Sequence, residues 1–390
     1  MPIDATNACT LAQALIRCPS VTPDEAGALT LLSQVLQPLG FTTERMPFSE
    51  PGTPDVDNLY ARLGREGPHL CFAGHTDVVP VGDAKAWTKP PFGGEINGAF
   101  LYGRGAVDMK GAIACFIAAV ARCTAGGGTI NGSISLLITG DEEGPSINGT
   151  AKMLEQLSAR GERLDACIVG EPSNPNALGD EIKIGRRGSL NGELVVYGRQ
   201  GHAAYPHKAE NPVPKLARLI DRLSSQTLDH GTPDFEPSSL QVTVISAPNA
   251  AANVIPSEAR AKFNIRYNDQ WRRPALEDWV RLQLDAGAER VAARYDVTFS
   301  GTGDVFLTKP GPLVETMCDA VRAVTGRTPA LTTGGGTSDA RFIQAYCPVI
   351  EFGLVNQTIH QVDEHVAIAD LEQLTRIYQH FIAGYFGGQS

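Results

Sequence analysis

The amino-acid sequence predicts an α/β protein with a mostly parallel sheet, into which a smaller α+β domain is inserted. Over roughly the first 185 residues, short runs that are apolar throughout alternate with helix-like segments, as in a sheet covered on both faces. Between about residues 188 and 300, strand-like runs alternate apolar and polar residues, so each has one solvated face. We therefore expect a discontinuous larger domain of residues 1–187 and 301–390, interrupted by residues 188–300.

The larger domain begins with two segments of helical spacing, residues 5–17 and 25–40, and Gly40 is a plausible terminator of the second. Three short apolar runs then indicate buried strands, and an apolar segment between the first two, residues 109–123, indicates a buried helix. The strands are expected at residues 69–74, 133–140 and 165–170. Because each strand–helix–strand unit takes about 30 residues, neighbouring strands should run parallel.

The inserted segment follows the order β-α-β-β-α-β, which is typical of a small ferredoxin-like α+β layer. Residues 211–226 predict an amphipathic helix, because their leucines and isoleucine form one stripe. The strands are expected at residues 189–198, 239–246, 259–268 and 295–301, and the second helix at residues 272–291. After "LTKPGP", residues 307–312, the α/β pattern resumes.

The composition argues against several classes of protein. The net charge of −10 disfavours a protein that binds nucleic acid through a basic surface. Eight cysteines are scattered in or beside apolar segments without a Cys-x-x-Cys pair, which indicates reduced thiols in a reducing compartment. No leader-like start is evident, and no apolar stretch reaches the ~18 residues of a membrane helix. We expect a cytoplasmic protein that binds neither nucleic acid nor membrane.

Polar residues that can bind a metal follow the predicted strands. His75 and Asp77 follow the first apolar run, Glu142 and Glu143 follow "SLLITGD", and Glu171 follows the third run. Asp108 lies in the glycine-rich "YGRGAVDMKG" before the buried helix. The successive intervals from His75 through Asp108 and Glu142 to Glu171 are 33, 34 and 29 residues, about one β-α-β unit each. Because ligands of open α/β sheets bind beyond the carboxyl ends of the strands, we expect these side chains in one cleft.

A cleft with so many acids requires a compensating cation. The carboxylates cannot all ionise together when partly buried, and only Arg104 and Lys110 accompany them in these segments. Histidine together with Asp and Glu suits zinc or a related transition metal. His75 and Asp77 face the same way along an extended chain, so Asp77 can hold the second ring nitrogen of His75.

Each of these residues alone also has an ordinary structural explanation. His75 with Asp77 fits a hydrogen-bonded loop element, and Asp108 fits an acid at a helix start. Glu142 with Glu143 fits a solvated loop, and Glu171 fits a turn. Four such groups at β-α-β intervals are much harder to explain in this way, so together they favour a metal centre.

Seven motifs resemble those of the co-catalytic zinc aminoacylase and carboxypeptidase superfamily. In chain order they are "FAGHTDVVP", "YGRGAVDMKG", "GDEEG", "VGEPS", "GRQGHAAYPH", "GGGTSDARF" and "IHQVDEH". Trp87, "PPF" at residues 90–92, "GRRGSLNG" and "HAAYPHKAENP" are similar to the desuccinylases within it. The resemblance covers essentially the whole chain. It implies a metallohydrolase domain that carries an inserted dimerisation or lid domain.

The resemblance implies two divalent metal ions, with zinc as the first expectation and cobalt as the alternative. Both ions would share Asp108 as a bridging carboxylate. One would also bind His75 and Glu171, and the other Glu143 and a C-terminal histidine.

Two assignments depend on matching the superfamily pattern residue by residue. A metal-binding histidine followed four residues later by Glu selects His360, with Glu364 in register, and leaves His365 as a surface residue. The same matching makes Glu142 the general base and Glu143 the ligand. The residues alone leave the order of these two acids open.

The implied activity is hydrolysis of an amide by a metal-activated water, with Glu142 as general base and Asp77 beside His75 as orienter. A further donor to the oxyanion would come from a histidine of the partner subunit's inserted domain, which matches His202 here. Without the resemblance, His202 between two small residues indicates only a turn. The resemblance thus implies a homodimer, formed through the inserted domain, that acts on a small molecule.

The desuccinylase details imply a substrate, N-succinyl-L,L-2,6-diaminopimelate, split into succinate and L,L-2,6-diaminopimelate in lysine biosynthesis. A substrate with several carboxylates should meet fixed cations and amide donors. The residues expected to bind it are Arg186, Tyr205, Asn253, Arg266, Gly336, Thr337, Ser338 and Asn356. Arg266 also lies on the polar face of an alternating strand, so a solvated sheet face is its ordinary alternative.

Other activities stay open at this point. An acetylornithine deacetylase or another aminoacylase of the same superfamily would keep every metal ligand. Residues 103–108, "GRGAVD", resemble a dinucleotide-binding fingerprint without its third glycine, but Asp108 would repel a pyrophosphate. A serine hydrolase would need a Gly-x-Ser-x-Gly motif, which is absent. A non-catalytic binding protein would not need Glu142 beside a full set of ligands.

Overall fold

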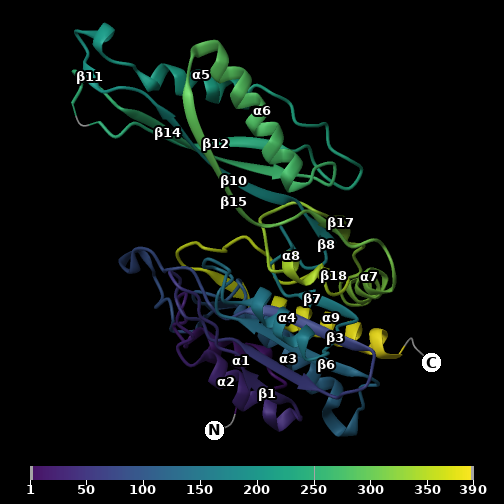
Figure 1. The fold of residues 1–390 in the computed structure, drawn as a ribbon. Coiled ribbons are helices and arrows are strands. Elements are labelled where there is room, and N and C mark those ends of the chain that lie inside the picture. Colours follow the sequence, from purple (N-terminus) through teal and green to yellow (C-terminus); the bar gives the residue numbers. More distant parts are fainter. Residues whose placement is uncertain (1–2, 250, 388–390) are drawn as a thin grey trace. The chain divides into compact units, whose positions relative to one another are not determined.

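The computed structural model describes residues 3–249 and 251–387 (Figure 1). The chain forms two compact units. The first contains residues 3–184, 308–332 and 338–387, and the second contains Gly185–Leu307 with Thr333–Thr337. Among the described residues, none of the helices combines the length and the apolar character needed to cross a membrane.

The first unit is built on an eight-stranded sheet with a parallel centre. In order across the sheet, the strands are β1 (Thr42–Arg45), β2 (Leu59–Leu63), β6 (Ser133–Thr139), β3 (His69–His75), β7 (Ala166–Val169), β18 (Val349–Glu351), β8 (Glu181–Lys183) and β17 (Ala330–Thr332). β3 pairs in parallel with β6 and β7, and β7 with β18, whereas β2 and β8 join antiparallel. β3 and β6 are buried along their whole length, as expected of strands covered on both faces.

Helices pack on this sheet and on one another. They are α1 (Ala8–Ile16), α2 (Ala28–Leu36), α3 (Lys110–Thr124), α4 (Thr150–Ala159), α7 (Pro312–Thr325), α8 (Ala340–Ile343) and α9 (Ile368–Gly387). α3 contacts β3, α1 and α9, and α9 also contacts α7. α3 is buried on every face as far as Ala121, which its small and apolar side chains allow. Gly40, with φ of +91°, ends the short turn that follows α2.

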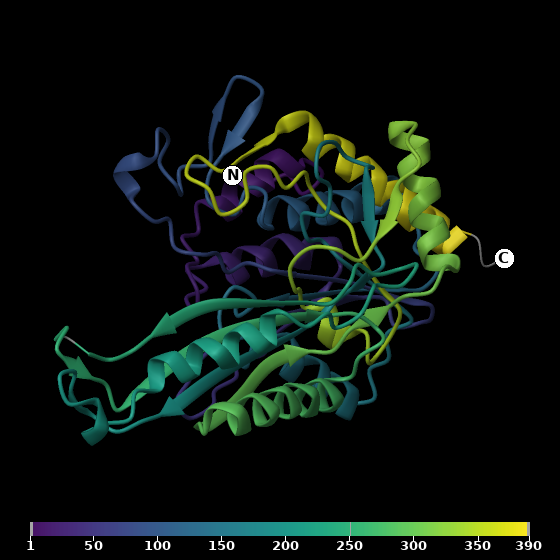
Figure 2. The same cartoon turned by 90° about the horizontal axis from the view of Figure 1, so that it is seen from above.

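The second unit is a four-stranded antiparallel sheet with two helices packed on it (Figures 1 and 2). Its strands in spatial order are β12 (Ser239–Ser246), β14 (Glu258–Tyr267), β10 (Gly188–Tyr197) and β15 (Arg294–Gly303), and its helices are α5 (Pro212–Ser224) and α6 (Arg273–Val291). Alternate residues of β10 and β14 are buried, and Leu194 and Phe263 join Leu219 of α5 and Leu284 of α6 in one core. The chain order β-α-β-β-α-β is as the sequence predicts.

Two short pairs of strands complete the second unit. β11 (Gly201–His202) pairs antiparallel with β13 (Val254–Ile255). β9 (Gly185–Arg186) pairs antiparallel with β16 (Phe306–Leu307). The α/β fold class with an inserted α+β layer is therefore confirmed.

Residues before the "GRGAVD" loop form an antiparallel hairpin. β4 (Glu95–Asn97) and β5 (Phe100–Tyr102) pair in a separate three-stranded sheet with β19 (His365–Ala367), and β4 is exposed throughout. A dinucleotide-binding loop follows a buried parallel strand. The hairpin therefore removes the structural basis for a dinucleotide site at residues 103–108.

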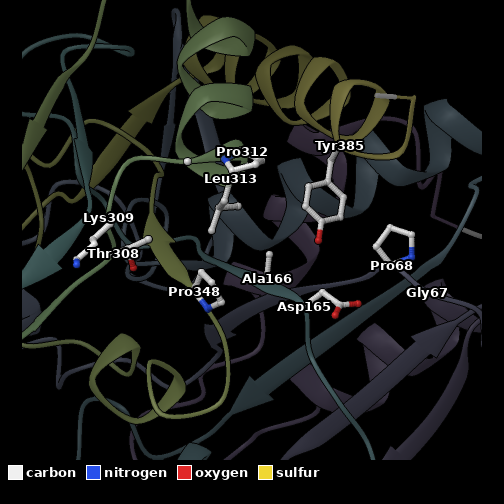
Figure 3. Close-up of a pocket in the computed structure, with 11 residues that line it drawn as sticks. Gly67, Pro68, Asp165, Ala166, Thr308, Lys309, Pro312, Leu313, Pro348 and Tyr385 are labelled. Carbon is white, nitrogen blue, oxygen red and sulfur yellow. The ribbon is translucent and has the colours of Figure 1, made fainter. Parts of the chain in front are cut away.

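A cavity of about 580 Å³ lies at the edge of the main sheet where the parallel strands begin (Figure 3). The cavity is lined by Pro68 just before β3, by Ala166 at the start of β7 and by Pro348 just before β18. Leu313 of α7 and Tyr385 of α9 complete the lining. The polar residues singled out in the sequence follow the other ends of the same strands. This cavity is thus separate from the predicted metal centre.

Candidate metal centre

The parallel pairing brings the carboxyl ends of three strands to one edge. The register places the end of β3 level with the end of β6, and β7 ends two residues short of that level. Asp108 joins this edge from the loop before α3, and His360 joins it from the loop after β18. The side chains gathered there are His75, Asp108, Glu142, Glu143, Glu171 and His360.

The first group of ligands consists of His75, Asp108 and Glu171. Nε2 of His75 lies 3.1 Å from Oδ1 of Asp108 and 3.7 Å from Oε1 of Glu171. The side chain of His75 is 1% exposed, and the two carboxylates are nearly buried. One imidazole nitrogen and two carboxylate oxygens therefore converge in a space that water barely reaches.

The second group consists of His360, Glu143 and the same Asp108. Nε2 of His360 lies 2.8 Å from Oε1 of Glu143 and 3.3 Å from Oδ2 of Asp108. Asp108 thus directs one carboxylate oxygen to each group. A carboxylate that bridges two metal ions would need this arrangement.

The spacing and the chemistry of both groups fit divalent ions. In each group one atom per residue can be chosen so that all lie within 4.8 Å of one another. Ligands about 2 Å from a tetrahedral ion stand roughly 3.4 Å apart, and the nitrogen–oxygen distances above lie on both sides of this value. Imidazole nitrogen with carboxylate oxygen is a donor set that zinc and related transition metals accept.

The pKa values of the cluster reflect how closely its buried carboxylates crowd one another. Burial raises the pKa of Glu171 well above its usual value, and the charges of Asp108 and Glu142 add to this. The hydrogen bonds to Asp108 and Glu143 raise the pKa of His360 to about 10. Bound dications would supply the positive charge that stabilises such crowded carboxylates.

The two basic residues near the cluster are engaged elsewhere. Nη1 of Arg104 donates to Glu364 over 2.7 Å. Nζ of Lys110 donates over 2.8 Å to the carbonyl of Cys18, and burial lowers the pKa of Lys110 to about 8. Neither side chain therefore forms an ion pair with the carboxylates of the two groups.

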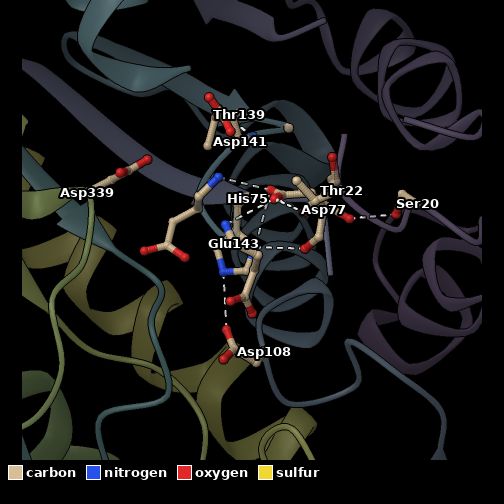
Figure 4. A network of polar contacts seen from close by, with 12 residues as sticks. Ser20, Thr22, His75, Asp77, Asp108, Thr139, Asp141, Glu143 and Asp339 are labelled. Carbon is tan, nitrogen blue, oxygen red and sulfur yellow. Dashed lines mark hydrogen bonds and ion pairs between the residues drawn. The ribbon is translucent and has the colours of Figure 1, made fainter. Parts of the chain in front are cut away.

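Asp77 orients the site in a different way from the one expected. Nδ1 of His75 donates to the backbone carbonyl of Asp77 over 2.9 Å, whereas the nearer carboxylate oxygen is 3.7 Å away (Figure 4). The carboxylate instead accepts hydrogen bonds from the Thr22 hydroxyl and from the backbone N–H groups of Glu142 and Glu143. The side chain of Asp77 thus holds the loop that carries the two acids, and its main chain holds the imidazole.

Glu142 lies beside both ligand groups. One of its carboxylate oxygens lies within 4.8 Å of ligand atoms of His75 and Glu143. Burial raises the pKa of Glu142 well above its usual value, and the nearby charge of Asp339 contributes to this. A carboxylate with a high proton affinity beside a metal centre can accept and release a proton.

The structure separates the two candidate histidines in "IHQVDEH". His360 adopts a φ of +59°, an uncommon conformation for a residue other than glycine, and points to Asp108 and Glu143. The ring of His365 instead stacks on Tyr102 at a centroid distance of 4.9 Å. His365 is therefore a half-buried packing residue and not the surface residue that the sequence suggests.

Most of the predicted substrate-binding residues belong to the second unit. Arg186 is buried and donates from Nη1 to the carbonyl of Gly334 over 3.0 Å, so it adjoins the loop that contains Gly336 and Thr337. Arg266 lies on β14, opposite Ser239 of β12.

His202, Tyr205 and Asn253 form another cluster in the second unit. The rings of His202 and Tyr205 are 5.6 Å apart, and the carbonyl of Asn253 accepts from the N–H of Ala203. All three predicted residues are exposed. The short pairing of β11 with β13 is what brings them together.

Ser338 and Asn356 lie in the first unit. Asn356 follows β18 and is partly exposed. Ser338 is fully buried, and its hydroxyl donates to the carboxylate of Glu351. This arrangement counts against a contact between the Ser338 side chain and a substrate, because the hydroxyl is committed to an internal acceptor.

The supporting roles of two residues in this site were not identified from the sequence. Thr22 donates to the Asp77 carboxylate over 2.6 Å. Glu364 is fully buried and accepts from the loop that carries Asp108. Spacing gives no signal for Thr22, because it lies in the N-terminal segment far from any other site residue. Glu364 has a signal only in its position four residues after His360.

Known proteins that are similar to this chain include metal-dependent hydrolases, which agrees with the geometry of the ligand groups. The chain is 58% identical over 378 residues to the succinyl-diaminopimelate desuccinylase of Rhodospirillum centenum, covering 97% of each chain. It is 56% identical over 380 residues to that of Parvibaculum lavamentivorans, covering 97% of this chain and 96% of the relative. These relatives confirm the resemblance noted in the sequence.

Solved structures share the fold at low sequence identity. A metallo-carboxypeptidase of the M20 family from Sulfolobus solfataricus superposes with a TM-score of 0.79 at 18% identity, covering 97% of this chain and 99% of the other. A dinuclear metal binding peptidase of the M20 family from Bacillus subtilis superposes with a TM-score of 0.70 at 14% identity, covering 97% and 98%. The model of peptidase family M20/M25/M40 matches residues 71–384. The chain belongs to this family.

Proposed function

We propose that the chain hydrolyses N-succinyl-L,L-2,6-diaminopimelate to succinate and L,L-2,6-diaminopimelate, a step of lysine biosynthesis. The observation that carries this proposal is the identity of 58% and 56% to two desuccinylases over 97% of the chain. The paired ligand groups around Asp108 support the metal-dependent amide hydrolysis that this reaction needs.

Two divalent ions belong to the proposal, with zinc preferred and cobalt as the alternative. His75, Asp108 and Glu171 would hold one ion, and Asp108, Glu143 and His360 the other. When bound, such ions polarise a carbonyl and lower the pKa of water. Asp77 supports both sets of ligands, because it fixes the ring of His75 and the loop of Glu143.

Glu142 is the proposed general base. Its carboxylate takes a proton from the attacking water and passes it to the departing amine, so the side chain ends the cycle unchanged. The high pKa that burial gives Glu142 suits the second half of this task. The hydrogen bond from its backbone N–H to Asp77 keeps the side chain beside the ligand groups.

His202 of a partner subunit is the proposed donor to the oxyanion. Nδ1 of His202 accepts from the N–H of Ala204 over 3.0 Å, so a neutral ring carries its proton on Nε2 and can donate from there. A homodimer through the second unit is part of this proposal. The edge strand β12 supports it, since Val244 and Ile245 are 44% and 64% exposed there.

The acyl and amino ends of the substrate carry carboxylates. Arg186, Arg266 and the exposed backbone around Gly336 are the proposed partners of these carboxylates. The further proposed contacts are Tyr205, Asn253, Thr337 and Asn356. The proposal describes the enzyme as a homodimer that acts on a small-molecule substrate in the cytoplasm. The eight free cysteines support the cytoplasmic location, because thiols stay reduced there.

The proposed function is tested by comparing substrates. The purified protein is loaded with zinc or cobalt, and turnover is measured on N-succinyl-L,L-2,6-diaminopimelate and on N-acetylornithine. We expect the succinyl substrate to have the higher kcat/KM, and a chelator to abolish the activity. Faster cleavage of acetylornithine would instead assign the chain to the deacetylases, and chelator-resistant hydrolysis would refute the metal centre.

Replacing His202 by Ala should abolish activity without loss of metal, because the residue lies on the second unit and every metal ligand lies on the first. A His202→Ala chain mixed with a His360→Ala chain should regain part of the wild-type kcat. In the mixed dimer one site receives His202 from its partner and keeps all its own ligands. Absence of any regain, with mixed dimers shown by mass spectrometry, would mean that His202 does not act across subunits.

A further inference from the structure

Glu364 is a buried carboxylate with no direct place in the proposed reaction. Its side chain is 0% exposed, and the residue lies four positions after His360 in the chain. Oε1 accepts from the N–H groups of Val107 and Asp108 over 2.9 and 3.2 Å. Oε2 accepts from Nη1 of Arg104 over 2.7 Å and from the N–H of Gly105 over 3.1 Å. Four donors from one short segment thus surround a single carboxylate.

These bonds determine where the bridging carboxylate lies. Asp108 is at the end of an irregular loop, so no ladder of strand or helix hydrogen bonds fixes its main chain. Glu364 supplies that restraint, because it binds the N–H of Asp108 and that of the preceding residue. The direction in which the Asp108 side chain leaves the main chain depends on this contact.

The same contact fixes the loop of His360. The backbone carbonyl of Glu364 accepts from the N–H of Gly103 over 2.9 Å, and Nη2 of Arg104 reaches the carbonyl of His360 over 3.4 Å. Asp363 adds two hydrogen bonds from Thr88. The loop of His360 and the loop of Asp108 are therefore joined side by side through Glu364.

We infer that Glu364 is a positioning residue that sets the second metal group, Asp108, Glu143 and His360. This inference rests on the proposed metal centre. Two of the three ligands of that group lie on the segments that Glu364 joins. The first group depends on Glu364 only through Asp108, because His75 is held by Asp77 and Glu171 lies two residues after the end of β7. Loss of the contact should therefore weaken the second site more than the first.

The substitution Glu364→Gln tests this with almost no change in volume. An amide has one oxygen and one NH2 group, and the NH2 group would face two donors on whichever side it took. Either the N–H groups of Val107 and Asp108 or those of Gly105 and Arg104 would lose their acceptor. Substitutions of residues that support metal ligands lower metal affinity by roughly 10- to 100-fold. We expect a loss of this size at the second site.

A matched control is available in the second unit. Asp229 is also a carboxylate that ties a loop together, since it accepts from the N–H groups of Gly231 and Ser238 and from the side chains of Asn268 and Trp271. Asp229→Asn removes a similar number of bonds in the unit that contains none of the proposed metal ligands. It should leave the affinity of both metal sites unchanged.

The experiment is a titration of chelator-treated protein with Co²⁺, followed by calorimetry and by visible absorption. Wild type and Asp229→Asn should show two sites of unchanged affinity, whereas Glu364→Gln should keep one tight site and bind the second ion 10- to 100-fold more weakly. Glu364→Asp, which keeps the charge but withdraws it from Val107 and Asp108, should weaken the same site and serves where the Gln variant does not fold.

Three results would contradict the inference. The first is that Glu364→Gln binds each of the two ions with the same affinity as the wild type does. The second is an equal loss at both sites, which would mean that Glu364 acts only on overall stability. The third is an unchanged second site in a folded Glu364→Asp protein. A wild-type protein that takes up no Co²⁺ would instead refute the metal centre, and this distinguishes failure of the proposed function from failure of the inference.

Discussion

Replacing Glu142 by Gln should lower kcat by on the order of 10² to 10⁴ while both metal sites stay filled. The amide of Gln cannot accept the proton of the attacking water, but it occupies the same space. The metal sites should persist because each keeps its histidine and its two carboxylates. The loop also keeps its main-chain hydrogen bonds to Asp77. Steady-state kinetics together with metal analysis of the same sample measures both quantities.

The control for this substitution is Glu155→Gln, which changes an exposed carboxylate on α4. It should leave kcat and metal content at wild-type values. If Glu142→Gln turned over substrate at the wild-type rate, the proton would have to be carried by another group. If it lost metal instead, Glu142 would have to be counted among the ligands.

Replacing Asp108 by Asn should lower the metal content from two ions to at most one and should nearly abolish turnover. Each oxygen of Asp108 serves a different ligand group, and an Asn side chain offers one oxygen and no charge. Metal ions of this kind stabilise the charge of the transition state by several kcal/mol, so the expected loss in kcat is on the order of 10³ or more.

His360→Ala is the matched comparison for Asp108→Asn. It removes a ligand from the second group only, so the first ion should remain bound. If Asp108→Asn retained two ions with wild-type affinity, the carboxylate would not bridge them. If His360→Ala lost both ions, the two groups would not be separable sites.

The meeting of the acids at one sheet edge could be predicted from the sequence for a simple reason. The intervals of 33, 34 and 29 residues return the chain to the same end of a parallel sheet after each β-α-β unit. His75, Asp108 and Glu171 do lie within reach of one another at that end. The spacing of these residues in the sequence predicts their meeting because β3 pairs with β6 and β7 in a regular parallel register.

Other features could not be predicted because they depend on contacts between distant segments. Sequence spacing places Asp77 beside His75, but the choice between its carbonyl and its carboxylate depends on Thr22 and on the loop after β6. Ser338 seemed available for substrate, yet the neighbouring Glu351 binds its hydroxyl. The packing of His365 on Tyr102 could not be predicted from spacing, because β19 and β5 pair across more than 260 residues of sequence.

The place of Asp108 in both ligand groups has a consequence for the order in which the site is synthesised. Synthesis delivers His75, Asp108 and Glu171 early, whereas His360 and Glu364 leave the exit tunnel only after the second unit has been made. All three residues of the proposed first ligand group are therefore synthesised before the second group is complete. In the proposed metal centre, only the full-length chain would supply every ligand for a pair of ions.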